Sequence, residues 1–68
     1  MPPDIGEVIR CIREESGYTM KHLADCCGID RKTIGRIENT GYANIKSVEA
    51  ILSALGYMLE VVPINGRD

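Results

Sequence analysis

The chain has few of the residues that build catalytic or metal centres. It contains one histidine and three cysteines among 68 residues. The cysteines are odd in number, and Cys26 and Cys27 are adjacent, so we expect reduced thiols and no disulfide framework. Histidine and cysteine do not recur at the spacing of a zinc site, no catalytic triad surrounds His22, and no glycine-rich loop could hold a phosphate. We therefore expect no metal, no cofactor and no enzymatic activity.

Long hydrophobic runs are also lacking. No segment approaches the roughly 20 apolar residues that span a bilayer, and no secretory signal is recognisable, so we expect a cytoplasmic protein without a membrane partner. A chain of 68 residues makes one domain, residues 1–68, with a modest core. Such cores usually need a disulfide, a metal or a second subunit. Because the first two are not expected, the length predicts a homodimer.

The net charge is small, but the charged residues are unevenly distributed. The net charge is −2. Between residues 19 and 37 the cations outnumber the acids by two, whereas in the rest of the chain the acids outnumber the cations by four. A local cationic patch suits a polyanion such as nucleic acid. An ordinary solvated helix face would carry the same charges, and the charge alone does not separate the two interpretations.

The segment that carries this patch reads as two short helices joined by a tight turn. Thr19 can cap the first helix through its hydroxyl, and Gly28 stands where a left-handed residue ends it. Asp30 can cap the second helix with its carboxylate. Because one residue separates Gly28 from Asp30, the helices cross steeply and must share a core with flanking helices. This pattern predicts a helix-turn-helix over residues 19–38.

Three cations follow the turn on the outer face of the second helix. Arg31 and Lys32 lie in its first turn, and Arg36 lies one helical turn after Lys32. In a helix-turn-helix this end of the second helix enters the major groove of DNA. Arginine can bind the O6 and N7 atoms of guanine with two hydrogen bonds, and lysine can bind them less rigidly. The pattern therefore predicts that these three residues read bases.

Helices are also predicted on both sides of this segment. Apolar residues at helical spacing predict a first helix from about residue 3 to 16, with Pro3 in its first turn and Gly17 after its end. Asn44 can cap a fourth helix that ends at Gly56. The fourth helix carries a continuous apolar stripe, which consists of Ile45, Val48, Ile51, Leu52 and Leu55.

The residues after Gly56 predict a β-strand over residues 57–62. Their polarity alternates, β-branched residues recur, and Pro63 stops the run. A lone strand would leave its backbone groups and a hydrophobic face in water, so we expect it to pair with its copy across a two-fold axis. A disordered or helical tail is the alternative. The predicted dimer interface consists of Tyr57, Met58, Leu59, Val61 and Val62.

Over residues 5–56 the sequence resembles the Cro/CI-type (XRE-like) helix-turn-helix regulators. The resemblance implies an all-α, lambda-repressor-like domain of four helices, here with one C-terminal β-strand that pairs across a dimer. It implies a sequence-specific transcriptional repressor that binds a palindromic operator in double-stranded DNA. The sequence departs from the family at two points. Met20 stands where a glutamine is usual, and Thr40 is an extra residue inside the Glu-Asn-Gly motif of the family, which here reads Glu38, Asn39, Thr40, Gly41. The matching residues are Thr19, Leu23, Ala24, Gly28, Ile29, Thr33, Ile34, Ile37, Glu38 and Asn39.

The resemblance also implies roles for individual residues. The base-reading positions of the family fall on Arg31, Lys32 and Arg36. The family also has a salt bridge between an arginine of the first helix and the glutamate that follows the DNA-reading helix, and these positions are Arg13 and Glu38 here. Gly35 lies inside the second helix of the helix-turn-helix, where glycine lowers the stability of the helix by about 1 kcal/mol relative to alanine. Either a close approach of the backbone to DNA or evolutionary drift could explain it. The residues expected to contact phosphates are Thr19, Thr33, Asn39 and Lys46, with Lys21 if the second helix lies across the groove.

Four helices followed by one strand are also similar to the HipB-like antitoxins, which bind operator DNA and a toxin protein. A chain of that class would have a cognate toxin as its second partner, whereas a plain repressor would not. A different alternative is a protein-interaction module that keeps the helix-turn-helix shape without specific DNA binding.

Overall fold

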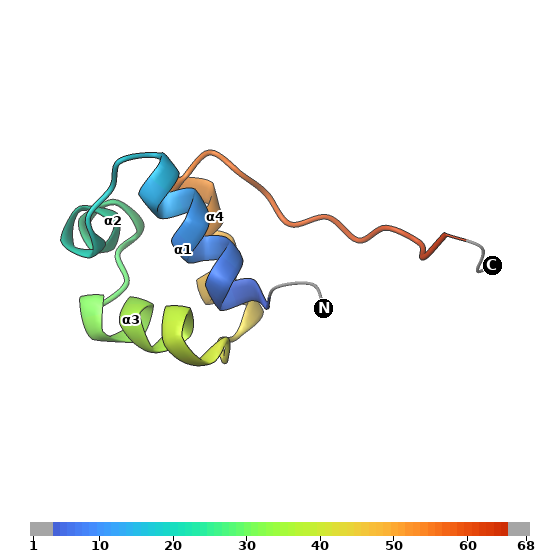
Figure 1. The fold of residues 1–68 in the computed structure, drawn as a ribbon, viewed down its shortest axis with the longest axis horizontal. Coiled ribbons are helices and arrows are strands. Elements are labelled where there is room, and N and C mark those ends of the chain that lie inside the picture. Colours follow the sequence, from blue (N-terminus) through green and yellow to red (C-terminus); the bar gives the residue numbers. More distant parts are fainter. Residues whose placement is uncertain (1–3, 66–68) are drawn as a thin grey trace.

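The computed structural model describes residues 4–65 (Figure 1). Within this range the chain forms four α-helices and no β-strand. Figure 1 shows the helices gathered together, with the segment after the last helix extending away from them. The predicted all-α class with four helices is confirmed. The helices are α1 (Ile5–Glu15), α2 (Met20–Cys27), α3 (Arg31–Thr40) and α4 (Ile45–Ala54).

Short polar side chains begin three of the helices. Thr19 Oγ1 accepts the His22 backbone N–H at 3.0 Å, and Asn44 Oδ1 accepts the Ser47 N–H at 2.8 Å, so both predicted caps are confirmed. The start of α1 differs from the prediction, because Asp4 is its N-cap and Asp4 Oδ1 accepts the Glu7 N–H at 3.0 Å. Helix α1 therefore begins at Ile5 and not near residue 3. The predicted position of Pro3 lies outside the described residues.

The turn between α2 and α3 has the predicted length but not the predicted cap. Gly28 has a φ of 73° and its N–H donates to the Ala24 carbonyl at 2.9 Å, which ends α2. Asp30 occupies the N-cap position of α3, but its side chain accepts no capping hydrogen bond. The prediction of a carboxylate cap was wrong here. The Asp30 side chain is exposed, so its carboxylate stays hydrated and loses little by leaving the first amides of α3 to water.

The core lies where the four helices meet. Both helices of the predicted helix-turn-helix contribute to it, together with α1 and α4, as the steep crossing requires. Ile45 was predicted to belong to the core stripe of α4, but 67% of its surface is exposed because the first turn of α4 runs beyond the core. The buried apolar side chains are Ile9, Leu23, Ile34, Ile37, Val48, Ile51 and Leu52.

A buried glycine sets the distance between α1 and α3. A Cβ atom added to Gly6 would overlap the carbonyl oxygen of Ile37 and would lie 3.0 Å from that of Glu38. Helix α1 thus passes directly over the backbone of α3, which only glycine permits. Nothing in the sequence pattern singled out Gly6, because the contact joins residues that are 31 positions apart. The contact fixes α3 with its opposite face toward solvent.

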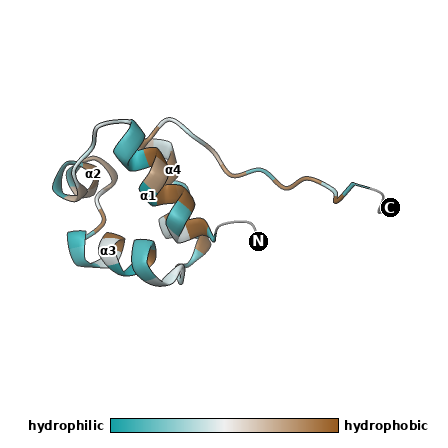
Figure 2. Ribbon diagram, viewed as in Figure 1, coloured by the Kyte–Doolittle hydropathy of each residue, from teal (hydrophilic) through white to brown (hydrophobic). Residues whose placement is uncertain are grey.

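The segment that follows α4 is extended and largely exposed. The Tyr57 N–H donates to the Leu52 carbonyl at 2.8 Å, and Leu59 packs partly against the core, but Val61 is 99% exposed. Figure 2 shows hydrophobic residues recurring along this segment. Residues 57–62 form no strand within the single chain, because a β-ladder needs a second strand. Pairing across a dimer therefore stays a prediction.

No helix formed by residues 4–65 is long and apolar enough to cross a membrane.

Candidate nucleic-acid interface

The exposed side of α3 carries three cations. Arg31, Lys32 and Arg36 are all exposed, and none has a carboxylate within ion-pair distance in the part of the chain between residues 4 and 65. The opposite side of α3 is buried through Ile34 and Ile37. Because the core holds one side of the helix, the cationic side is presented to solvent in a fixed orientation. Such a surface can bind anions or base acceptors without first breaking ion pairs.

The start of α2 adds two polar side chains beside this surface. Thr19 uses a lone pair to cap α2, so its own hydroxyl hydrogen is free to donate to a phosphate oxygen. Lys21 Nζ lies 3.4 Å from Asp25 Oδ2, and the two side chains are 75% and 68% exposed. An ion pair this exposed contributes little stability, so a phosphate can replace Asp25 as the partner of Lys21.

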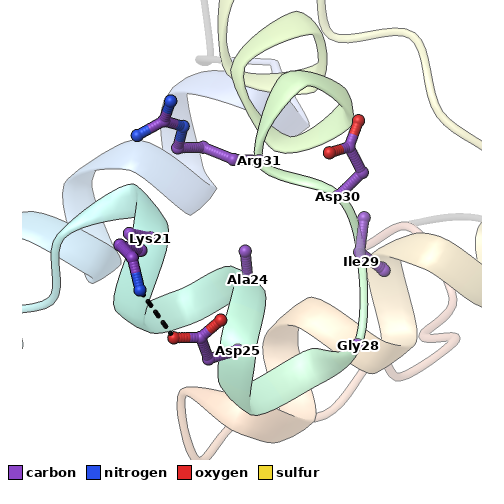
Figure 3. A pocket seen from close by; sticks show the side chains of 7 residues that line it. All are labelled: Lys21, Ala24, Asp25, Gly28, Ile29, Asp30 and Arg31. Carbon is purple, nitrogen blue, oxygen red and sulfur yellow. Dashed lines mark hydrogen bonds and ion pairs between the residues drawn. The ribbon is translucent and has the colours of Figure 1, made fainter.

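An open hollow of about 460 Å³ separates α2 from α3 (Figure 3). Figure 3 shows the Arg31 side chain extending from the start of α3 to the side on which Lys21 lies, while Asp30 lies on the other side. Two cations and two carboxylates border the hollow, so it favours neither sign of charge. Its lining consists of Lys21, Ala24, Asp25, Gly28, Ile29, Asp30 and Arg31. The hollow is the inside of the bend between the two helices, and because it is open it does not enclose a small ligand.

The remaining predicted phosphate contacts come from other parts of the molecule. Asn39 is exposed near the end of α3, and Lys46 is exposed in the first turn of α4. Thr33 is half-buried on α3 and is therefore less accessible than these two. The structure thus places polar groups at the start of α2, along α3 and at the start of α4, on three successive elements.

The extra residue before Gly41 has a structural role. Thr40 Oγ1 donates to the Arg36 carbonyl at 2.7 Å and accepts the Tyr42 N–H at 3.2 Å. Gly41, with a φ of 77°, then ends α3. The hydroxyl thus joins the last turn of α3 to the backbone just after Gly41, which explains how the stretched motif is accommodated.

A buried ion pair holds α3 against α1. Arg13 Nε donates to Glu38 Oε2 at 2.7 Å, and Arg13 Nη2 donates to Glu38 Oε1 at 3.0 Å. Arg13 Nη1 also donates to the Tyr18 carbonyl at 2.9 Å, so the same side chain ties down the loop before α2. The hydrogen bond to Glu38 raises the pKa of the Arg13 guanidinium against the effect of burial. The structure brings together the two residues that the resemblance pairs.

One contact near the surface, between Tyr18 and His22, was not predicted from the sequence. The rings of Tyr18 and His22 stack with centroids 4.4 Å apart and an interplanar angle of 9°. The stack joins the residue before the Thr19 cap to the first turn of α2, in which Lys21 also lies. Tyr18 precedes the helix, so helical periodicity could not reveal the pair.

A family model described as helix-turn-helix matches residues 9–61, which is most of the chain. The matched range includes all of α2, α3 and α4, most of α1 and the beginning of the extended segment. A comparison with curated proteins found no match.

Proposed function

Because the chain belongs to the XRE-like helix-turn-helix family of DNA-binding regulators, we propose that it is a dimeric transcriptional repressor of a palindromic operator. The exposed side of α3 carries this proposal. It displays Arg31, Lys32 and Arg36 without carboxylate partners among the described residues, on a helix that the core holds in place. In such a protein α3 enters the major groove of double-stranded DNA.

The proposed division of labour follows from the chemistry of the side chains. Arg31, Lys32 and Arg36 read bases, because guanidinium and ammonium groups match the acceptors of guanine in the major groove. Because the rest of the chain is acidic, attraction to phosphates in general is weak, and firm binding needs two half-sites. Phosphates are held by Thr19, Lys21, Thr33, Asn39 and Lys46.

The second half-site requires a second subunit. In one chain the segment after α4 leaves Met58, Val61 and Val62 between 66% and 99% exposed, which is costly in water. Antiparallel pairing of two such segments would cover the hydrophobic side chains and satisfy the free backbone groups. The dimer would then place two copies of α3 about 34 Å apart, in successive major grooves. Occupancy of a promoter by this dimer blocks transcription.

A more specific form of this repressor is an antitoxin with a toxin protein as its second partner, because four helices followed by a predicted C-terminal strand are also similar to the HipB-like antitoxins. Co-expression with the product of the adjacent gene tests this form. A stable complex of the two proteins supports an antitoxin, and two separate proteins indicate a plain repressor.

Replacement of Arg36 by alanine should weaken binding to the preferred duplex by at least tenfold. The loss of two hydrogen bonds from an arginine to guanine lowers the binding free energy by about 1–3 kcal/mol in each half-site. A dimer carries the substitution in both half-sites. The preferred duplex is selected from a random library, and affinities are measured by fluorescence anisotropy at one salt concentration. Arg10→Ala, an exposed cation on α1, is the matched control.

Equal affinities of the Arg36 and Arg10 variants would contradict the assignment of α3 as the reading helix. Binding that weakens with salt but shows no preference among sequences would favour the protein-interaction module instead.

Replacement of both Val61 and Val62 by lysine should convert the dimer into a monomer. The two neighbours point to opposite faces of an extended segment, so the double variant places a charge on whichever face is covered. Both residues are exposed in the single chain, so the helices should be unaffected. Sedimentation equilibrium at micromolar concentration measures the mass, and circular dichroism reports the helices. Asn65→Lys, beyond the predicted strand, should remain dimeric, whereas a wild-type chain that sediments as a monomer would refute the dimer.

A further inference from the structure

The first residue of α2 closely approaches the middle of α3. A Cβ atom added to Gly35 would lie 3.7 Å from Met20 Sδ and would meet no other atom of residues 4–65 within 4 Å, apart from the backbone of α3 and the adjacent residues. Met20 packs partly against the core, and both residues are half-buried. The absence of a side chain at Gly35 therefore leaves a small apolar gap at the surface, with the Met20 side chain along one side.

This gap lies beside two of the exposed cations of α3. Gly35 follows Lys32 by three residues and Arg31 by four, so both are its neighbours on the helix surface, and Arg36 is the next residue in the chain. The gap is consequently part of the surface that would face DNA. Packing does not require it, because the 3.7 Å separation is an ordinary contact distance and alanine would fit. Alanine is also the better helix former, so folding alone does not account for Gly35.

In the major groove the one apolar group at a base edge is the C5-methyl of thymine, which lies close to the acceptors that arginine and lysine bind. A gap bordered by a thioether and a glycine Cα has no donor for a phosphate, is apolar like a methyl group, and lets such a group approach the backbone because no Cβ lies between them. We propose that the gap between Met20 and Gly35 accepts the C5-methyl of one thymine in each operator half-site, which makes both residues specificity determinants. This inference rests on the proposed DNA-binding function.

The test removes the methyl group without changing base pairing. A duplex is first selected from a random library with the wild-type protein, and it is then resynthesised with deoxyuridine in place of each thymidine in turn. We expect one position in each half-site at which the loss of the methyl group weakens wild-type binding. The expected loss is about fourfold, because this is the gain in affinity from burying one methyl group. For Gly35→Ala, whose Cβ fills the gap, the thymine and uracil duplexes should bind equally.

The controls separate this effect from folding and from DNA binding itself. Thermal unfolding should show that Gly35→Ala is at least as stable as the wild type, so a loss of methyl dependence cannot be due to misfolding. Cys11→Ala, an exposed helical position on α1, should keep the fourfold dependence. Met20→Gln, which makes the side of the gap polar, should lose it.

Two results would overturn the inference while leaving the proposed function intact. One is a selected duplex in which no thymine can be replaced by uracil with a loss of affinity. The other is a Gly35→Ala variant with the same methyl dependence as the wild type. If the selection yields no preferred duplex, the DNA-binding function fails and the inference fails with it.

Discussion

Replacement of Arg13 by alanine should lower the free energy of unfolding by about 3–5 kcal/mol, the cost of leaving a buried charge without its partner. The Glu38 side chain is only 1% exposed, and it accepts two hydrogen bonds from Arg13. A chain of 68 residues is expected to be stable by roughly 3–10 kcal/mol in total. The loss should therefore be a large fraction of the total stability.

Urea unfolding followed by circular dichroism measures this loss, and an exposed ion pair of the same chain provides the control. Lys21→Ala breaks the ion pair with Asp25. Because solvent screens both of these side chains, the substitution should lower the free energy of unfolding by less than about 1 kcal/mol. The double variant Arg13→Met, Glu38→Leu should recover most of the stability, because no charge remains buried. A loss well under 1 kcal/mol for Arg13→Ala alone would contradict the burial of the pair.

Replacement of Gly6 by alanine should destabilise the protein by about 3 kcal/mol, near the upper end of the usual cost of overpacking. The new methyl group would overlap the Ile37 carbonyl oxygen, and a backbone atom cannot rotate out of the way as a side chain can. Helix α1 would have to move away from α3, which would also strain the bond between Arg13 and Glu38.

The same change at Gly35 is the matched control for Gly6, because both are glycines inside helices. Gly35→Ala introduces only an ordinary contact with Met20 and should raise the free energy of unfolding by up to about 1 kcal/mol. Urea unfolding of both variants measures the two effects. Opposite signs are expected, and equal effects would show that α1 and α3 do not approach as closely as Gly6 indicates.

The residues that end and begin α2 and begin α4 could be predicted from local sequence. Thr19, Gly28 and Asn44 act through hydrogen bonds that span three or four residues, so the neighbours that they need are always within reach. Helical periodicity likewise predicted that Arg31, Lys32 and Arg36 share the side of α3 away from the core, since the spacing of a helix is constant.

The capping of Asp30 and the burial of Ile45 were predicted wrongly for a common reason. Both depend on surroundings that periodicity does not describe. The Asp30 carboxylate is exposed to water, and Ile45 lies beyond the edge of the core. The strand predicted over residues 57–62 depends on a second chain in the same way, because the backbone of one chain cannot supply its own ladder.

Local pattern is thus sufficient for the helices, the turn and the cationic side of α3, because each rests on residues within about one helical turn of one another. The approach of α1 to α3 at Gly6, the geometry of the Arg13–Glu38 pair and the gap between Met20 and Gly35 join residues that are 15 or more positions apart. Such contacts exist only once the helices have packed at particular crossing angles and distances, since side-chain spacing along each helix leaves both undetermined.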